Sequence, residues 1–522
     1  MSQPTLVPSS QTAPPASAAT RLTSKATGKP VLKRKLPKEV IWLGVAVAVA
    51  LLIINFIEPT VVIADGEVIT PGLTSVGVNG LAVIIPTMIL WLSVGTGWTS
   101  LLAIAALIAL QVLTPGQAWA SSLGSPLIAT ILIFSLLARQ LKVSGVIDWV
   151  AAWFITRPFL KGRPRMFLAT LVFSQLFLGF AVQGLSLGII YLDLVTRLAE
   201  KLGVKKGSSL YTVLVQGVLW GNGVVNTISP LVATWPLTMI GMLAAAGYTV
   251  TPAMWLAASI PFAFLGFLVI VICTVAARPD VTALKQLDFD EFKANQPPLT
   301  RAGKLSIAVV TGAFVFIMLP GLFDVMGIFE GFASYVSSMG ITVPGIAAIA
   351  LLGLIRDKGQ SILKYEDLMK TNPTSSLVFL ASIFAISVPL SSEAAGINVW
   401  LNSLLSPIFG GLSPFWIIAA AVIGSTVLTN FMSNSVTMIL FFTIGSSLLY
   451  GVDSTSIPTL GVLMVLSSSM AVLIQPASVL PALAFSEKHV TVAKTWKTNL
   501  LYMFGTMLVM IAMIPWIQNV FA

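Results

Sequence analysis

Cysteine and histidine are almost absent from this chain of 522 residues, where Cys273 and His489 are the only examples. A single cysteine excludes a disulfide framework within the chain, and a single histidine excludes a metal site built from several histidines. Charged side chains are also scarce, at 9% of residues. Soluble domains carry about 25% charged residues, so this composition excludes a soluble globular enzyme.

Long apolar runs occupy much of the chain, and 56% of its residues are hydrophobic. A helix needs about 20 apolar residues to span a bilayer, so this length accommodates about ten to twelve spans. We therefore expect an all-α multi-pass membrane protein. The apolar runs predict helices near 40–57, 78–94, 97–114, 124–138, 252–276, 305–323, 342–354, 374–390 and 499–520.

The basic residues follow one pattern relative to these spans. Of the 29 Lys and Arg, seven precede the first helix, and the others fall in loops on the same side of the membrane. The opposite loops, at 58–77, 114–122, 324–341 and 391–455, contain none. Because short cytoplasmic loops are enriched in Lys and Arg, we expect the cytoplasmic (plasma) membrane, a cytoplasmic N-terminus and an outside C-terminus. The net charge of +10 then needs no nucleic acid as partner.

Two neighbouring stretches do not form simple spans. The 31 residues of 166–196 enter and leave on the basic side, whereas two full crossings need about 40 residues. This length predicts a re-entrant hairpin with its tip near 182–184. The next stretch begins at Ser208 and crosses once, although it contains Gly221, Asn222, Gly223, Asn226, Thr227 and Pro230. Such a cluster predicts a helix that is broken in mid-membrane and lines a polar cavity.

The same layout recurs in the second half of the chain, with the 251-residue offset that separates Gly145 from Gly396. At that offset Trp149 recurs as Trp400, the tip 182–184 as 433–435, and Thr227 and Pro230 as Ser478 and Pro481. An odd number of crossings separates the copies, so we expect the second hairpin, at 413–450, to enter from the outside. Inverted repeats with paired broken helices are typical of secondary transporters whose site lies at the midplane.

Neither tip and neither break contains an ionisable side chain. This absence argues against a cation/proton antiporter, which would use an acidic residue at that depth. Helix N-termini can bind an anion through free N–H groups, and carbonyl groups freed at breaks suit sodium. Bringing one negative charge into a negative-inside cell costs about 2.3 kcal/mol per 100 mV. Uptake of a dianion therefore needs co-transported cations, whereas anion exchange does not, and the residues leave both open.

The stretch LTNFMSNSVT at 428–437 resembles the Ser-Asn-Thr hairpin tip of the divalent-anion:sodium symporter family, within the ion-transporter superfamily. The likeness extends from about residue 120 to the C-terminus. It implies eleven transmembrane helices and two re-entrant hairpins in an inverted repeat, with two broken helices. It also implies a homodimer formed through a scaffold domain, an elevator-type movement, and di- or tricarboxylates or sulfate as substrates.

The resemblance also implies roles for individual residues. Asn434 and Ser435 would contact the anion, and the second sodium site would consist of Thr429, Ser433, Asn434 and Ala477. The first copy has 182–184 where the family has Ser-Asn-Thr, and Leu178 where it has a hydroxyl, which leaves the first sodium site open. The substrate-binding residues that we expect are Gln183, Gly184, Asn226, Thr227, Asn434, Ser435 and Ser478.

Other interpretations remain at this stage. An anion exchanger or a monocarboxylate transporter of the same superfamily is the nearest alternative, and a cation/proton antiporter is a more distant one. We expect no enzyme activity and no cofactor, with Na⁺ as the coupling ion and a small anion, the lipid bilayer and a second copy of the chain as partners. Asp193 and Arg197 lie four residues apart and predict a local helix ion pair rather than a coupling site.

The chain is expected to have six parts. They are a disordered cytoplasmic tail at 1–38, N-terminal scaffold helices at 39–115, a first repeat with a cytoplasm-facing hairpin at 116–277, a cytoplasmic loop at 278–304, further scaffold helices at 305–372, and a second repeat with an outside-facing hairpin and a last helix at 373–522.

Overall fold

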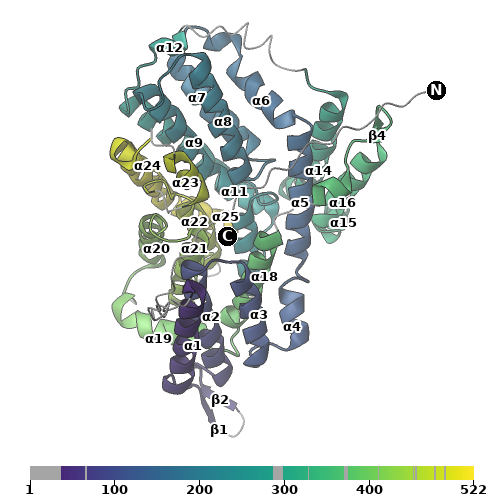
Figure 1. Cartoon of the computed structure of the whole chain (residues 1–522). Helices are drawn as coiled ribbons and strands as arrows, with labels where there is room; N and C mark the ends of the chain where they lie inside the picture. Colours follow the sequence, from purple (N-terminus) through teal and green to yellow (C-terminus); the bar gives the residue numbers. More distant parts are fainter. Residues whose placement is uncertain are drawn as a thin grey trace, which may run out of the picture.

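The computed structural model describes residues 37–64, 67–285, 298–326, 328–369, 374–409, 411–450, 452, 455–474, 478–486 and 490–522. Most of the predicted tail, 1–36, and part of the predicted loop, 286–297, lie outside these residues. The described chain is a bundle of helices with two short strand pairs (Figure 1). The all-α multi-pass fold predicted from the sequence is confirmed.

The N-terminal helices form one end of the molecule with the first strand pair (Figure 1). They are α1 (Lys38–Phe56), α2 (Ser75–Ser93), α3 (Trp98–Ala109) and α4 (Pro115–Ser121), with β1 (Val62–Ala64) antiparallel to β2 (Glu67–Thr70). Several helices begin directly after a residue whose side chain caps them. At the start of α2, the Thr74 hydroxyl accepts a hydrogen bond from the Gly77 N–H. Such a cap satisfies an N–H group that the helix itself leaves unpaired.

The first repeat follows directly. It consists of α5 (Pro126–Val143), α6 (Val146–Ile155), the 3₁₀ turn η1 (Pro158–Leu160), α7 (Pro164–Leu178), α8 (Gly184–Lys201), α9 (Ser209–Ile228), α10 (Thr234–Ala245) and α11 (Pro252–Ala276). The segment between the repeats contains α12 (Thr282–Lys285), α14 (Arg301–Met326), α15 (Glu330–Ser338), α16 (Thr342–Leu354), β3 (Arg356–Asp357), β4 (Gln360–Ser361) and α17 (Tyr365–Met369).

The second repeat has the same order of elements. It consists of α18 (Thr374–Ser391), α19 (Ile397–Phe409), α20 (Pro414–Leu428), α21 (Asn434–Leu448), α22 (Ser456–Ser468), α23 (Val479–Ser486), α24 (Val492–Ala512) and α25 (Ile514–Phe521). Gly145 and Gly396, which precede α6 and α19, both adopt the left-handed conformation, with φ of 74° and 67°. Figure 1 places α6 and α19 toward opposite ends of the molecule, as an inverted repeat requires.

The predicted spans correspond closely to helices. The ranges 252–276 and 342–354 are reproduced to the residue as α11 and α16, and 499–520 is realised as α24 and α25 with a bend of 44° between them. By length and composition, five described helices are able to cross a membrane, or seven if each bent pair is one span. This count is smaller than the expected number of spans because several apolar helices are short, such as α3, α10 and α16 with 12, 12 and 13 residues.

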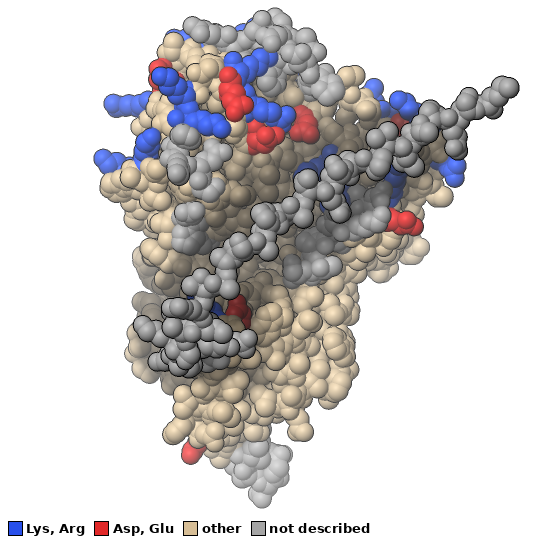
Figure 2. All heavy atoms as spheres, viewed as in Figure 1, with Lys and Arg blue, Asp and Glu red and all other residues tan. Residues whose placement is uncertain are grey.

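The basic side chains gather toward one end of the molecule. Figure 2 shows Lys and Arg gathered toward the end of the molecule that contains α7, α8 and α12, and none at the opposite end around β1 and β2 on that face. Asp193 and Arg197 form the predicted local ion pair on α8, with 2.7 Å between carboxylate and guanidinium. Both side chains are exposed, so the pair contributes to the surface of the basic end.

The register of the repeat needs two corrections. The hairpins are related by an offset of 250, since α8 begins at 184 and α21 at 434. Gln183 therefore corresponds to Ser433, and Gly184 to Asn434. The shift arises because the stretch from 396 to 414 is one residue shorter than the stretch from 145 to 164.

The second correction concerns the breaks. Residues 221–227 are helical in α9, and the break lies at 229–233. In the second copy α22 ends at Ser468 and α23 begins at Val479, so the predicted pairing of Thr227 and Pro230 with Ser478 and Pro481 is wrong. Pro236 and Pro481 instead share the third position of α10 and α23. A longer connection in the second copy accounts for the difference.

Candidate functional site

The first hairpin tip lies against the broken helix of its own repeat. The Nε2 of Gln183 donates a hydrogen bond to the Thr234 hydroxyl at the start of α10, at 3.0 Å. Gly184, at the start of α8, lies so close to Asn226 that a Cβ on the glycine would collide with the Asn226 amide. The structure thus brings together three of the predicted substrate residues, Gln183, Gly184 and Asn226, around the end of α9.

A cavity of about 290 Å³ adjoins this tip. Its wall includes Gln183 and Ser186 from the start of α8, together with Thr234 from the start of α10. Helix N-termini carry a partial positive charge and unpaired N–H groups, so two such ends favour an anion. The opposite wall is formed by α5 and α18 and contributes two basic side chains, Arg139 and Lys142.

The sequence alone predicts no binding role for these two basic residues. Arg139 and Lys142 lie in the last two turns of α5 and were counted among the basic residues of the cytoplasmic side. A signal was present in the spacing, because Ser135, Arg139 and Lys142 recur at i, i+4 and i+7 and thus share one face of a helix. That face lines the cavity.

The second hairpin tip forms a buried polar cluster. The Thr429 hydroxyl lies 3.1 Å from Asn434 Oδ1 and 2.6 Å from the Ser468 carbonyl oxygen at the end of α22. Thr429 is fully buried and Asn434 is 5% exposed. The Ser433 carbonyl accepts from the Thr437 hydroxyl at 3.0 Å. Two predicted sodium ligands, Thr429 and Asn434, are therefore in contact, while Ala477 lies outside the described residues.

Asn430 fastens this tip to the second break, a role that the sequence did not reveal. Its Oδ1 accepts hydrogen bonds from the N–H groups of Val472 and Leu473, both at 2.9 Å. The Val472 carbonyl accepts from Asn499 Nδ2 at 2.8 Å, and Asn499 Oδ1 accepts from Trp220 Nε1 at 2.9 Å. This buried network connects the second hairpin, through α24, to α9 of the first repeat.

The two broken helices approach each other closely near the tips. A Cβ on Gly223 of α9 would lie 3.0 Å from the carbonyl oxygen of Ser469, at the start of the second break. Asn226, which contacts the first tip, is about one helical turn further along α9. Ser468, which contacts the second tip, adjoins Ser469. Each tip therefore contacts a broken helix close to the point where the two broken helices meet.

The remaining predicted residues differ in their surroundings. The Thr227 hydroxyl donates to the Val224 carbonyl at 2.7 Å, and the Thr227 carbonyl accepts from Trp255 Nε1 at 3.0 Å. The end of α9 is thus already capped by α11, so these groups are not directed to the cavity. Ser435 is 9% exposed in the first turn of α21, and Ser478 is partly exposed just before α23.

One buried amide oxygen is left without a partner near the point where the broken helices meet. Asn222 Oδ1 has no hydrogen-bond partner among the described residues, although Asn222 is only 8% exposed. A Cβ on Gly188 of α8 would lie 3.0 Å from this oxygen and 2.5 Å from a methyl group of Leu480. Such an oxygen is a candidate ligand for a cation or an ordered water, because buried polar atoms are normally satisfied.

The comparisons with known proteins bear on the fold. No protein-family model and no curated protein matches the sequence. Among solved structures, the chain is similar to the YdaH transporter of Alcanivorax borkumensis, with a TM-score of 0.55 and 12% identity over 92% of this chain and 97% of that one. The chain has a transporter fold. It is also similar to MtrF of Neisseria gonorrhoeae, from a class of antimetabolite efflux pumps, with a TM-score of 0.53 and 13% identity over 92% and 96% of the two chains.

Proposed function

We propose that the protein is a secondary active transporter of small organic or inorganic anions, of the di- or tricarboxylate type, that is coupled to sodium. The observation that carries the proposal is the cavity at the first hairpin tip, because two helix N-termini and two basic side chains share its wall. Its volume of about 290 Å³ is at the lower end of the range for ligand pockets, about 300–1,000 Å³, which favours a small substrate.

The charge of the cavity favours a multivalent anion. Each helix N-terminus contributes about half a positive charge, and Arg139 and Lys142 contribute one each. Among the described residues that line the cavity there is no Asp or Glu. A dicarboxylate, tricarboxylate or sulfate would neutralise more of this positive wall than a monocarboxylate would. The same wall disfavours a cation as cargo, which argues against a cation/proton antiporter.

Sodium coupling is proposed from the second tip. Thr429, Asn434 and the Ser468 carbonyl bring three oxygen atoms into one buried cluster, and oxygen atoms at a helix break suit sodium. Import of a dianion against a negative-inside potential costs about 4.6 kcal/mol at 100 mV, twice the value for one charge. Two or more sodium ions that enter with it would offset this cost. Exchange for another anion is the nearest variant, since it also removes the charge imbalance.

We further propose the architecture of the symporter family that the second tip resembles. The cavity lies between two parts of the molecule, since α8 and α10 contribute one wall and α5 and α18 the other. An elevator-type movement would slide the hairpins and broken helices against a scaffold formed by 39–115 and 305–372. The scaffold would also form the homodimer. The basic end would face the cytoplasm, so that this cavity is the inward opening.

A binding experiment on the purified full chain tests the proposal. We expect succinate, citrate or sulfate to raise the thermal unfolding temperature in a sodium-dependent manner, because a ligand that binds only the folded state stabilises it. Acetate at the same ionic strength should do so less. Arg139→Gln should weaken the anion effect, and Arg163→Gln, an exposed arginine that does not line the cavity, should leave it unchanged. Equal shifts with every salt, or no dependence on Arg139, would reject the proposal.

A further inference from the structure

The outer faces of α7 and α11 form an apolar surface on the side of the first hairpin. Along α11, Phe264, Leu268 and Ile272 are 61%, 41% and 60% exposed at a spacing of four residues. The helices pack together, with the rings of Phe173 and Phe267 in edge contact at 5.7 Å between centroids. In a membrane-spanning chain such a face lies against acyl chains.

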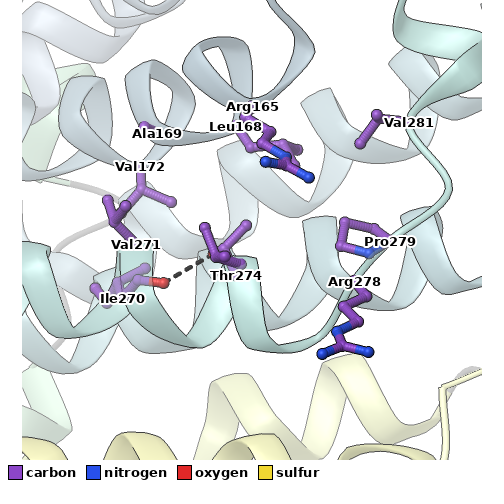
Figure 3. A pocket seen from close by; sticks show the side chains of 11 residues that line it. Arg165, Leu168, Ala169, Val172, Ile270, Val271, Thr274, Arg278, Pro279 and Val281 are labelled. Atoms are coloured by element: carbon purple, nitrogen blue, oxygen red, sulfur yellow. Dashed lines mark hydrogen bonds between the residues drawn. The ribbon is translucent and has the colours of Figure 1, made fainter.

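Two arginines stand where this surface meets the basic end of the molecule. Arg165 is the second residue of α7, and Arg278 follows the end of α11 by two residues. Both line a cavity of about 70 Å³ between the helices. Figure 3 shows Arg165 over the space between α7 and α11, and Arg278 beyond the end of α11 with its guanidinium pointing away from Arg165. The Arg278 side chain is exposed, so solvent leaves it room to turn toward Arg165 when an anion binds between them.

The other side chains of this cavity are mostly aliphatic. Leu168 and Val172 face Ile270 and Val271 across it (Figure 3). The hydroxyl of Thr274 donates to the Ile270 carbonyl at 2.8 Å and so satisfies a group of its own helix. Arg165 thus stands over an apolar floor, and Arg278 adds a second cation beside it. This combination suits a ligand that is anionic at one end and apolar at the other.

The backbone at Arg278 adds an independent observation. Arg278 has a φ of +45°, in the left-handed region where glycine is the usual residue after a helix. Replacement of Arg278 by glycine would therefore relieve backbone strain at this position. Asp280, the nearest acid along the chain, is held by the Thr282 hydroxyl and N–H at 2.6 and 3.1 Å, which lowers the pKa of its carboxyl.

A second, larger hollow adjoins the first at Ala169. It has a volume of about 360 Å³, shares Ala169 with the smaller cavity, and is walled by Trp153, Phe154, Phe159, Phe173 and Phe267. Arg157 lies at its edge, with its guanidinium carbon 4.0 Å from the centre of the Trp153 ring. An acyl chain fits this aromatic wall, and a third cation stands beside it.

We propose that the crevice between α7 and α11 binds an anionic phospholipid. Its phosphate would lie between Arg165 and Arg278, and an acyl chain would occupy the hollow walled by Trp153 and Phe173. A free phosphate would use the arginines but leave the apolar hollow empty, so the surface fits the lipid better. Because α6 and α7 wall the hollow, the bound lipid would stabilise the first hairpin in its present position. The inference requires the membrane fold and is independent of the transported substrate.

The test uses the full chain purified in a neutral detergent. We expect phosphatidylglycerol to raise the thermal unfolding temperature, and phosphatidylcholine and inorganic phosphate to have little effect. In Arg165→Gln with Arg278→Gly, each lost cation should raise the lipid concentration for half-maximal stabilisation about fivefold, which corresponds to about 1 kcal/mol per basic residue. Arg278→Gly alone should fold readily, because it relieves the left-handed strain.

A control variant and two competing ligands test the assignment of the crevice to an anionic lipid. Arg163, the N-cap residue of α7, is exposed and lines neither hollow, so Arg163→Gln should respond to phosphatidylglycerol like the unmodified chain. Equal stabilisation by phosphatidylcholine would overturn the headgroup assignment. A full effect of inorganic phosphate would assign the arginines to a free anion, and an unchanged response of the double variant would remove them from any lipid site.

Discussion

The close approach of Gly184 to Asn226 gives the sharpest prediction for the first hairpin tip. A Cβ at Gly184 would overlap the Asn226 amide, so Gly184→Ala must displace either the tip or the end of α9. Overpacking of this kind costs about 1–3 kcal/mol. Asn226→Ala removes the obstructing amide, and we expect the double variant Gly184→Ala with Asn226→Ala to recover much of the lost stability.

Thermal unfolding of the four proteins, with and without citrate and sodium, measures this coupling. Residues in contact show interaction energies of about 0.5–3 kcal/mol, whereas distant sites add. Gly312→Ala in α14 is the matched control, because a Cβ there meets nothing within 4 Å, and it should be neutral or slightly stabilising. Strictly additive effects of Gly184→Ala and Asn226→Ala would refute the packing of the tip on α9.

Four further variants examine the site and the repeat. Arg139→Gln is expected to raise the KM for a dianion about tenfold or more, with a smaller effect on kcat, because a charge-assisted hydrogen bond contributes about 1.5–3 kcal/mol. Initial uptake rates measure both constants. An unchanged KM would exclude contact between Arg139 and the substrate. Asn434→Ala should abolish uptake while the protein is still produced, and full uptake would remove Asn434 from the site. Ser144 and Ala394 are accessible, whereas the native Cys273 is buried. Single cysteines introduced at Ser144 and at Ala394 should react with an impermeant reagent from opposite sides of the membrane. Reaction from the same side would disprove the inversion of the repeats.

Much of the fold follows from the sequence because apolar runs of spanning length have few alternatives to a helix in a bilayer. The first hairpin was also predictable, since 166–196 is too short for two crossings. The repeat register was harder. Connections tolerate insertions at little energetic cost, so one residue fewer after Gly396 and a longer second break moved the equivalent positions.

The site was less predictable, because it depends on contacts between distant segments. In the sequence, Arg139 and Lys142 are two basic residues near the end of a helix. Only the packing of α5 near the first tip shows that they line the cavity. Asn430 was one polar residue among several. Its role emerges only where the second break returns to it, 42 and 43 residues further along the chain.

Uptake by reconstituted liposomes is the most direct test of anion transport by this chain. We expect labelled succinate, citrate or sulfate to accumulate when sodium is higher outside and the interior is negative, and accumulation to stop when sodium is replaced by choline. Asn434→Ala, reconstituted at the same density, should not accumulate the anion. Intact protein that moves none of these anions under any gradient, or that accumulates them equally with Asn434→Ala, would contradict the proposed site and function.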